Sequence, residues 1–293
     1  MLKPTHIFLA VLVTAIWGFN FVVIKIGVAT MPPLLLTGLR FSLSAIPAIF
    51  FVARPNAPLS YVFSFGFVLG VIKFGLLFVA IHIGLAAGLA SLVLQLQAFF
   101  TIVFASVILS DRPIPLQILG GALALSGIGV IAASRWSGPE LLPLGLVIAA
   151  ACAWGVANLI SKKSGETNVL SFIVWASLIP PIPLFILSWA LEPHDLILAT
   201  FTHPSVMALG AVAFLAWPAT IFGFGVWNFL LSKYPASTVA PFSLLVPIFG
   251  IASGVLILGE SFDHLTIIGT VLVILGLLIN TFGARLTLAL KPA

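Results

Sequence analysis

Polar side chains interrupt the long apolar stretches of this sequence, at spacings that suit contact with a small charged molecule. Trp17 and Asn20 stand three residues apart and Trp154 and Asn158 stand four apart, so each pair shares one face of a helix. Amide groups form hydrogen bonds with both carboxylates and ammonium groups, and an indole face attracts an ammonium ion. These residues are therefore candidates for contact with a zwitterionic substrate.

A further set of polar residues lies in one apolar stretch between them. Ser91 and Gln95 form a single helical stripe, whereas Gln97 belongs to another, so the two glutamines cannot face the same way. The competing interpretation is that asparagine and glutamine join helices, while tryptophan fills the core or lies at the membrane interface. Both interpretations stay open for each residue.

Three cations, Lys25, Arg40 and Lys73, fall within or near the apolar stretches. Lys25 can extend its ammonium group to the nearer surface, Arg40 lies about 10 Å deep at 1.5 Å per helical residue, and Lys73 is the most interior. No aspartate or glutamate lies in the middle of such a stretch. We predict that Arg40 or Lys73, together with Asn20 and Gln95, anchors a substrate carboxylate. Pairing of the cations with carbonyl groups at helix ends is the alternative.

The composition places these residues in a membrane protein. Of 293 residues, 61% are hydrophobic and 6% are charged, with a mean hydropathy of +1.29, whereas soluble domains carry about 25% charged residues. A soluble enzyme, a nucleic-acid-binding protein and a disordered chain are therefore excluded. Cationic loops explain the net charge of +5 better than a nucleic-acid partner does. The single cysteine, Cys152, excludes an intrachain disulfide and a four-cysteine metal site.

Ten stretches are long enough to cross a bilayer as helices, for which about 20 apolar residues are needed. They cover residues 5–27, 33–53, 59–81, 86–109, 114–133, 142–161, 168–190, 206–230, 236–258 and 263–284. The apolar runs are continuous, which favours helices over the alternating strands of a barrel. Lysine and arginine concentrate in the segments that share a side with the N-terminus. Because these residues resist translocation, both termini are predicted to be cytoplasmic.

The two halves of the chain resemble each other. Trp17-Gly18 and Lys25 match Trp154-Gly155 and Lys162 at an offset of 137 residues. Farther along, Asp111 matches Glu260 at an offset of 149. The twelve additional residues fall in the connection 191–205, which is the only one long enough to hold them.

This pattern predicts two five-helix repeats, at residues 1–136 and 137–293. An odd number of spans in each repeat inserts the second repeat upside down relative to the first. Inverted repeats are the architecture of secondary transporters, which place a binding site near the midplane and expose it alternately to the two sides. The expected fold is an all-α integral membrane protein with ten transmembrane helices and both termini in the cytoplasm.

Several motifs carry a resemblance to a known family. They are the Trp-Gly pairs, Arg40 within Leu39-Arg40-Phe41, the acidic residues that close the fourth and ninth spans, and the strings at 18–25, 31–34, 47–55, 88–95, 97–102, 240–241 and 243–247. Through them the chain resembles the EamA family of the drug/metabolite transporter superfamily. The resemblance implies a multi-pass exporter of the bacterial inner membrane for small amino-acid-like metabolites of the cysteine and O-acetylserine type. One departure is Ala98 in the fourth span, where the ninth span has Pro247.

Other functions stay open at this point. Export of other amino acids, hydrophobic amines or drugs is the main alternative, and a channel is less favoured. No catalytic or phosphate-binding motif occurs, so neither an enzyme nor a cofactor is expected. His194, Asp195 and His203 share one loop at irregular spacing, which favours a solvated loop over a metal site.

The expected partners are a small-molecule substrate and lipid, without nucleic acid, in a monomer or a homodimer. The Gly-x-x-x-Gly motifs at 66–70, 84–88 and 250–254 serve internal packing or dimer contacts equally well. Proton antiport is disfavoured because no acid or histidine lies in mid-span. Facilitated export, or coupling through His82 or Asp111, stays open.

Overall fold

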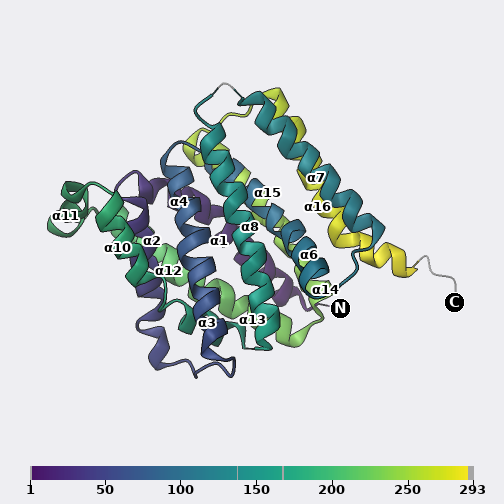
Figure 1. Cartoon of the computed structure of the whole chain (residues 1–293), viewed down its shortest axis with the longest axis horizontal. Coiled ribbons are helices and arrows are strands. Elements are labelled where there is room, and N and C mark those ends of the chain that lie inside the picture. The colour runs from purple at the N-terminus through teal and green to yellow at the C-terminus, as the bar shows by residue number, and fades with distance from the viewer. Residues whose placement is uncertain (1, 137, 167, 290–293) are drawn as a thin grey trace.

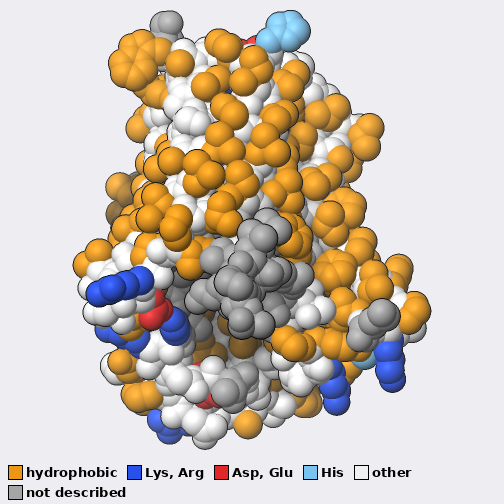
Figure 2. Space-filling model, turned by 90° about the vertical axis from the view of Figure 1, so that its right-hand side faces the viewer, with side chains coloured by type: hydrophobic (Ala, Val, Ile, Leu, Met, Phe, Trp, Pro, Cys, Tyr) orange, Lys and Arg blue, Asp and Glu red, His pale blue; other side chains and the backbone are white. Residues whose placement is uncertain are grey.

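A computed structural model describes residues 2–136, 138–166 and 168–289, which form helices and no strand. Ten helical segments are long and apolar enough to cross a membrane, so the predicted ten spans are confirmed. The helices pack side by side as one bundle (Figure 1). The exposed face in Figure 2 is mostly hydrophobic, and its lysine and arginine side chains gather toward one end.

The first five spans combine regular helices with two irregular segments. Pro4, Pro33 and Pro115 stand at first helical positions, where the missing N–H would have no acceptor in any case. The elements are α1 (Pro4–Val28), α2 (Pro33–Ala45) with the 3₁₀-helix η1 (Ala48–Phe50), α3 (Leu59–Gly66) with the π-helix η2 (Phe67–Lys73) and α4 (Phe74–His82), α5 (Ala87–Val93) with the 3₁₀-helix η3 (Leu94–Leu96) and α6 (Gln97–Ile108), and α7 (Pro115–Ser134).

The second five spans repeat this plan. They are α8 (Leu141–Ser164), α9 (Val169–Ala176) with α10 (Pro181–Leu191), α12 (Val206–Ala216) with the π-helix η4 (Trp217–Phe222) and α13 (Gly223–Lys233), α14 (Ala236–Val239) with the 3₁₀-helix η5 (Ala240–Leu244) and α15 (Leu245–Leu258), and α16 (His264–Ala289). The connection that holds the additional residues forms the short helix α11 (His194–Thr202).

The two halves interlock through matching glycines. A Cβ atom on Gly18 of α1 would lie 2.5 Å from Cβ of Phe249 in α15. A Cβ atom on Gly155 of α8 would lie 2.8 Å from Cβ of Phe100 in α6. These two contacts correspond under the repeat offsets of 137 and 149 residues. Each half therefore completes its packing against the other.

Helices α7 and α16 run side by side at one edge of the bundle (Figure 1). A Cβ on Gly120 would lie 2.6 Å from the carbonyl oxygen of Gly276, and one on Gly127 equally close to that of Gly269. Such close backbone approach requires small residues. The glycines make the fifth and tenth spans a closely packed helix pair.

Candidate functional site

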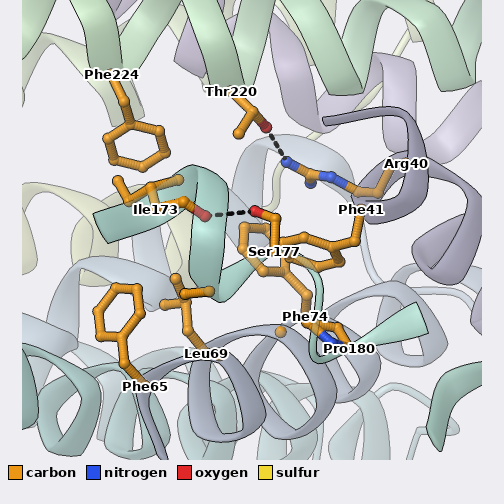
Figure 3. Close-up of a pocket in the computed structure, with 13 residues that line it drawn as sticks. Arg40, Phe41, Phe65, Leu69, Phe74, Ile173, Ser177, Pro180, Thr220 and Phe224 are labelled. Atoms are coloured by element: carbon orange, nitrogen blue, oxygen red, sulfur yellow. Dashed lines mark hydrogen bonds between the residues drawn. The ribbon is translucent and has the colours of Figure 1, made fainter. Parts of the chain in front are cut away.

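Arg40 lies inside the bundle with only 3% of its surface exposed. Its Nη2 donates to the hydroxyl of Thr220 over 2.8 Å and to the carbonyl of Leu215 over 3.4 Å, as Figure 3 shows for the first contact. Nε and Nη1 are buried and find no acceptor among the described residues. The guanidinium therefore keeps hydrogen-bond donors free for an incoming acceptor.

Lys73 ends the π-helix η2 and is also only 3% exposed. Its Nζ lies 3.2 Å from the ring centroid of Phe74 and 4.4 Å from that of Trp154. The guanidinium carbon of Arg40 lies 4.4 Å from the same Phe74 ring. The salt bridges found among the described residues lie elsewhere, at Arg135–Glu140 and Lys162–Asp111. Two buried cations thus share one aromatic ring, and ring faces supply only part of the stabilisation that a carboxylate gives.

Two π-helices position these side chains. The offset of 149 residues matches η2 to η4 within one residue, and π-helical turns are rare and frequent at functional sites. Pro218 in η4 has no N–H to donate, which favours a local change of helical register. In η2, a Cβ on Gly70 would collide with the ring of Pro180. Pro218 therefore gives η4 a local cause in the sequence, and Gly70 lets η2 pack closely against Pro180.

The π-helix of each half meets the tryptophan of the other half. Trp17 Nε1 donates to the carbonyl of Ala219 in η4 over 2.8 Å. Trp154 presents its ring to Lys73 in η2. The ring of Trp17 also packs against those of Phe224 and Trp227, with centroids 5.3 and 5.2 Å away.

A pocket lies between the two halves at Arg40 (Figure 3). Its walls are mostly aromatic and aliphatic, with Arg40, Thr220 and Ser177 as the polar groups, as is typical of small-molecule sites. One wall is the break between α9 and α10, which includes Ser177 and Pro180. The space inside the pocket, about 10 Å³, is about enough for one water molecule. A larger occupant requires the lining side chains or helices to move.

The structure brings some predicted site residues together and separates others. Arg40 and Lys73 both lie against the Phe74 ring, and Trp154 contacts Lys73. Trp17 joins this group through its hydrogen bond to η4. Asn20 is buried on α1, and its Oδ1 has no donor among the described residues.

The other four predicted residues have local partners. Ser91 Oγ donates to Gly88 O over 2.6 Å, and Gln95 Nε2 reaches Ser243 O at 3.4 Å. Asn158 Nδ2 donates to Gln97 Oε1 over 2.6 Å, joining α8 to α6. The helix-joining interpretation therefore describes the Gln97–Asn158 pair in this conformation.

The glycine motifs and Lys25 also have observed partners. Gly66 and Gly70 pack against the α9–α10 break, and Gly250 packs against Ser91, so these motifs serve internal contacts. Lys25 donates to the carbonyls of Ile81 and Leu85 over 2.9 and 3.3 Å. It thus pairs with carbonyls at a helix end, which is the alternative considered for the interior cations.

Sequence reasoning missed Thr220, Phe74 and Ser177 as pocket residues. A signal was available for Ser177, because the offset of 137 places it opposite Arg40. Thr220 follows Pro218 in the middle of an apolar span, and a polar residue beside a helix-disrupting proline was a second signal. Phe74 carries no such mark, since phenylalanine occurs 25 times in this chain.

Comparisons with known proteins find a transporter family and relatives of similar length. The model of the EamA-like transporter family matches twice, at residues 4–133 and 141–282. A "Probable amino-acid metabolite efflux pump" of Escherichia coli strain K12 is 44% identical over 289 residues, 97% of each chain. The protein of the same name from Salmonella typhimurium is 44% identical over 284 residues, 95% of each chain.

A more distant relative and a solved structure also match this chain. A "Probable terminal-alkyne amino-acid exporter" of Streptantibioticus cattleyicolor is 28% identical over 209 residues, 68% of this chain and 66% of that protein. A solved structure titled "Crystal structure of protein" shares the fold, with a TM-score of 0.65 and 18% identity over 97% of this chain and 99% of that one. The two family matches cover both halves of the bundle, and the chain belongs to the EamA-like transporter family.

Proposed function

We propose that this protein exports small amino-acid-like metabolites across the bacterial inner membrane by alternating access. Membership of a transporter family supports the transport class. The names of the two relatives of 44% identity support the substrate class and the outward direction. Within that class, cysteine and O-acetylserine are the first substrates to test, with other amino acids and hydrophobic amines as the alternatives.

The buried donors of Arg40 carry this proposal. A cation at membrane depth costs at least about 2.5 kcal/mol on insertion scales, and Nε and Nη1 of Arg40 have no acceptor among the described residues. A substrate carboxylate between Arg40 and Lys73 supplies both the acceptor and the counter-charge. A hydrogen bond to a charged group contributes about 1.5–3 kcal/mol, which is about tenfold to a hundredfold in affinity.

The ammonium end of an amino acid has suitable partners on the neighbouring elements. The rings of Trp17 and Phe224 pack together beside η4, and aromatic faces attract ammonium groups. Asn20 offers a buried carbonyl oxygen without a donor among the described residues. Gln95 stays a candidate for contact with the carboxylate once the halves have moved.

The direction of transport depends on orientation. We propose that both termini are cytoplasmic, because lysine and arginine concentrate on the side of the N-terminus. We also propose that the two repeats cover residues 1–136 and 137–293. The pocket then lies between two inverted repeats, as in other secondary transporters.

Uptake into everted membrane vesicles tests the substrate. Radiolabelled cysteine, O-acetylserine, an aromatic amino acid and a hydrophobic amine are compared at equal concentration, each with and without its unlabelled form inside. We expect saturable uptake of the labelled amino acids, which becomes faster when the unlabelled form is inside the vesicles. Uptake of their carboxamides should be weak. Transport of sugar phosphates without amino acids contradicts the proposal, and unsaturable flux without acceleration indicates a channel.

A further inference from the structure

At one end of the bundle, a glutamate side chain accepts hydrogen bonds from backbone N–H groups at the start of a helix. Glu260 accepts hydrogen bonds from the N–H groups of Ala87 and Gly88 over 2.5 and 2.9 Å. These N–H groups begin α5 and would otherwise lack acceptors. All seven residues of α5 are buried. A Cβ on Gly254 would collide with the Glu260 carboxylate, so glycine at that position makes room for this cap.

A lysine completes the same end. Lys25 of α1 donates to the carbonyls of Ile81 and Leu85, at the end of α4 and in the connection to α5. Helix-end carbonyls also require donors when they are buried. We call this arrangement of Glu260 and Lys25 the sealed end.

The repeat offsets place the same two residue types at the opposite end. Asp111 corresponds to Glu260 and Lys162 to Lys25. The turn is also the same, because the Asp111 N–H bonds to Ala105 O over 3.3 Å as the Glu260 N–H bonds to Gly254 O over 3.1 Å. The backbone frame of the acidic residue is therefore equivalent at the two ends.

The partners at this second end differ. Lys162 Nζ and Asp111 Oδ2 pair with each other at 2.6 Å, and their side chains are 60% and 55% exposed. Residues 240–244 of η5 include no buried residue, whereas their counterparts 91–95 are all buried. We call this arrangement of Asp111 and Lys162 the open end.

We propose that the transport cycle exchanges these partners between the two ends. When the open end closes, Asp111 leaves Lys162 and caps the backbone N–H groups of residues 236 and 237, the counterparts of Ala87 and Gly88. Lys162 turns to the carbonyls of Leu230 and Tyr234, the counterparts of Ile81 and Leu85. At the other end, Glu260 and Lys25 release the helix ends and pair with each other in water.

The exchange keeps each of these four charged side chains partnered in both states. A buried helix end without its partner is costly, whereas an exposed ion pair contributes only about 0–1 kcal/mol. Each cap therefore stabilises closure of its own end, and the two ends offer equivalent caps, which lets the alternating-access cycle run in both directions. This inference rests on the alternating access of the proposed function and not on the identity of the substrate.

Thiol labelling of purified protein in detergent tests the exchange without any substrate. In a Cys152→Ser background, one reporter is Ala90→Cys at the sealed end, where Ala90 is fully buried, and the other is Ala240→Cys at the open end. The labelling rate of each reporter with a polar maleimide is measured alone and combined with Glu260→Gln or Asp111→Asn. Glu140→Gln, which removes an acid paired with Arg135, is the matched control.

The exchange predicts opposite shifts. Glu260→Gln should accelerate labelling at position 90 and slow it at position 240, by about tenfold, which corresponds to about 1.4 kcal/mol. Asp111→Asn and Lys162→Gln should slow labelling at position 90, and the control should change neither rate. Shifts in the same direction for Glu260→Gln and Asp111→Asn overturn the proposal, as does an unchanged rate at position 90 in both. If Glu260→Gln fails to fold, Asp111→Asn and Lys162→Gln decide by the same criterion.

Discussion

The two halves supply the buried cations unequally although their backbones correspond. Each half has a π-helix in its third span and a tryptophan that meets the other half's π-helix. Yet both cations, Arg40 and Lys73, come from the first half. Their counterparts in the second half are Ser177 and Phe222. Motion between two states requires equivalent backbone arrangements in the two halves. Recognition of an anionic group requires positive charge from only one of them.

Among these tests of the asymmetry, replacement of Arg40 should have the largest effect on transport. Arg40→Gln removes the donors proposed for the substrate carboxylate, so the half-saturation concentration for uptake should rise by about a hundredfold. Uptake in everted vesicles measures this, with the amount of protein in the membrane quantified in parallel. Normal kinetics in this variant, or its absence from the membrane, would make Arg40 a structural residue.

Trp154 tests whether the second half contributes through its ring. Trp154→Leu should raise the half-saturation concentration by about fivefold to thirtyfold, since a desolvated cation–π contact contributes about 1–2 kcal/mol. In a double-mutant cycle with Lys73→Gln, the effect of Trp154→Leu should disappear. Additive effects of the two substitutions would mean that the ring acts independently of the ammonium group.

Ser177 should give the smallest effect. Its hydroxyl donates to Ile173 O within the same helical segment over 2.7 Å, so Ser177→Ala leaves the free donors of Arg40 unchanged. We expect half-saturation values within about twofold of the unaltered protein, because a bond of this kind contributes at most about 0.5–1.5 kcal/mol to stability. A shift as large as that of Arg40→Gln would indicate that the two halves share recognition equally.

The sequence predicts the spans and the cations for one physical reason. Apolar runs and charged residues are visible without a structure, because lipid excludes charge. The π-helix η2 is not visible in this way, since the close packing of Gly70 involves Pro180 of another span. The partner of Arg40, Thr220, is 180 residues away. Helical spacing alone therefore cannot distinguish the Gln97–Asn158 pair, which joins two helices, from the residues that lie around Phe74.

The glycine contacts between α7 and α16 impose an order on biosynthesis. Gly120 and Gly127 of α7 find their partners, Gly276 and Gly269, only in the last span of the chain. The ribosome completes α16 after every other helix, since synthesis runs from the N-terminus. The face of α7 that carries these glycines thus lacks its partner helix while the second half is being inserted. The edge of the bundle formed by these two helices therefore assembles after the nine earlier spans.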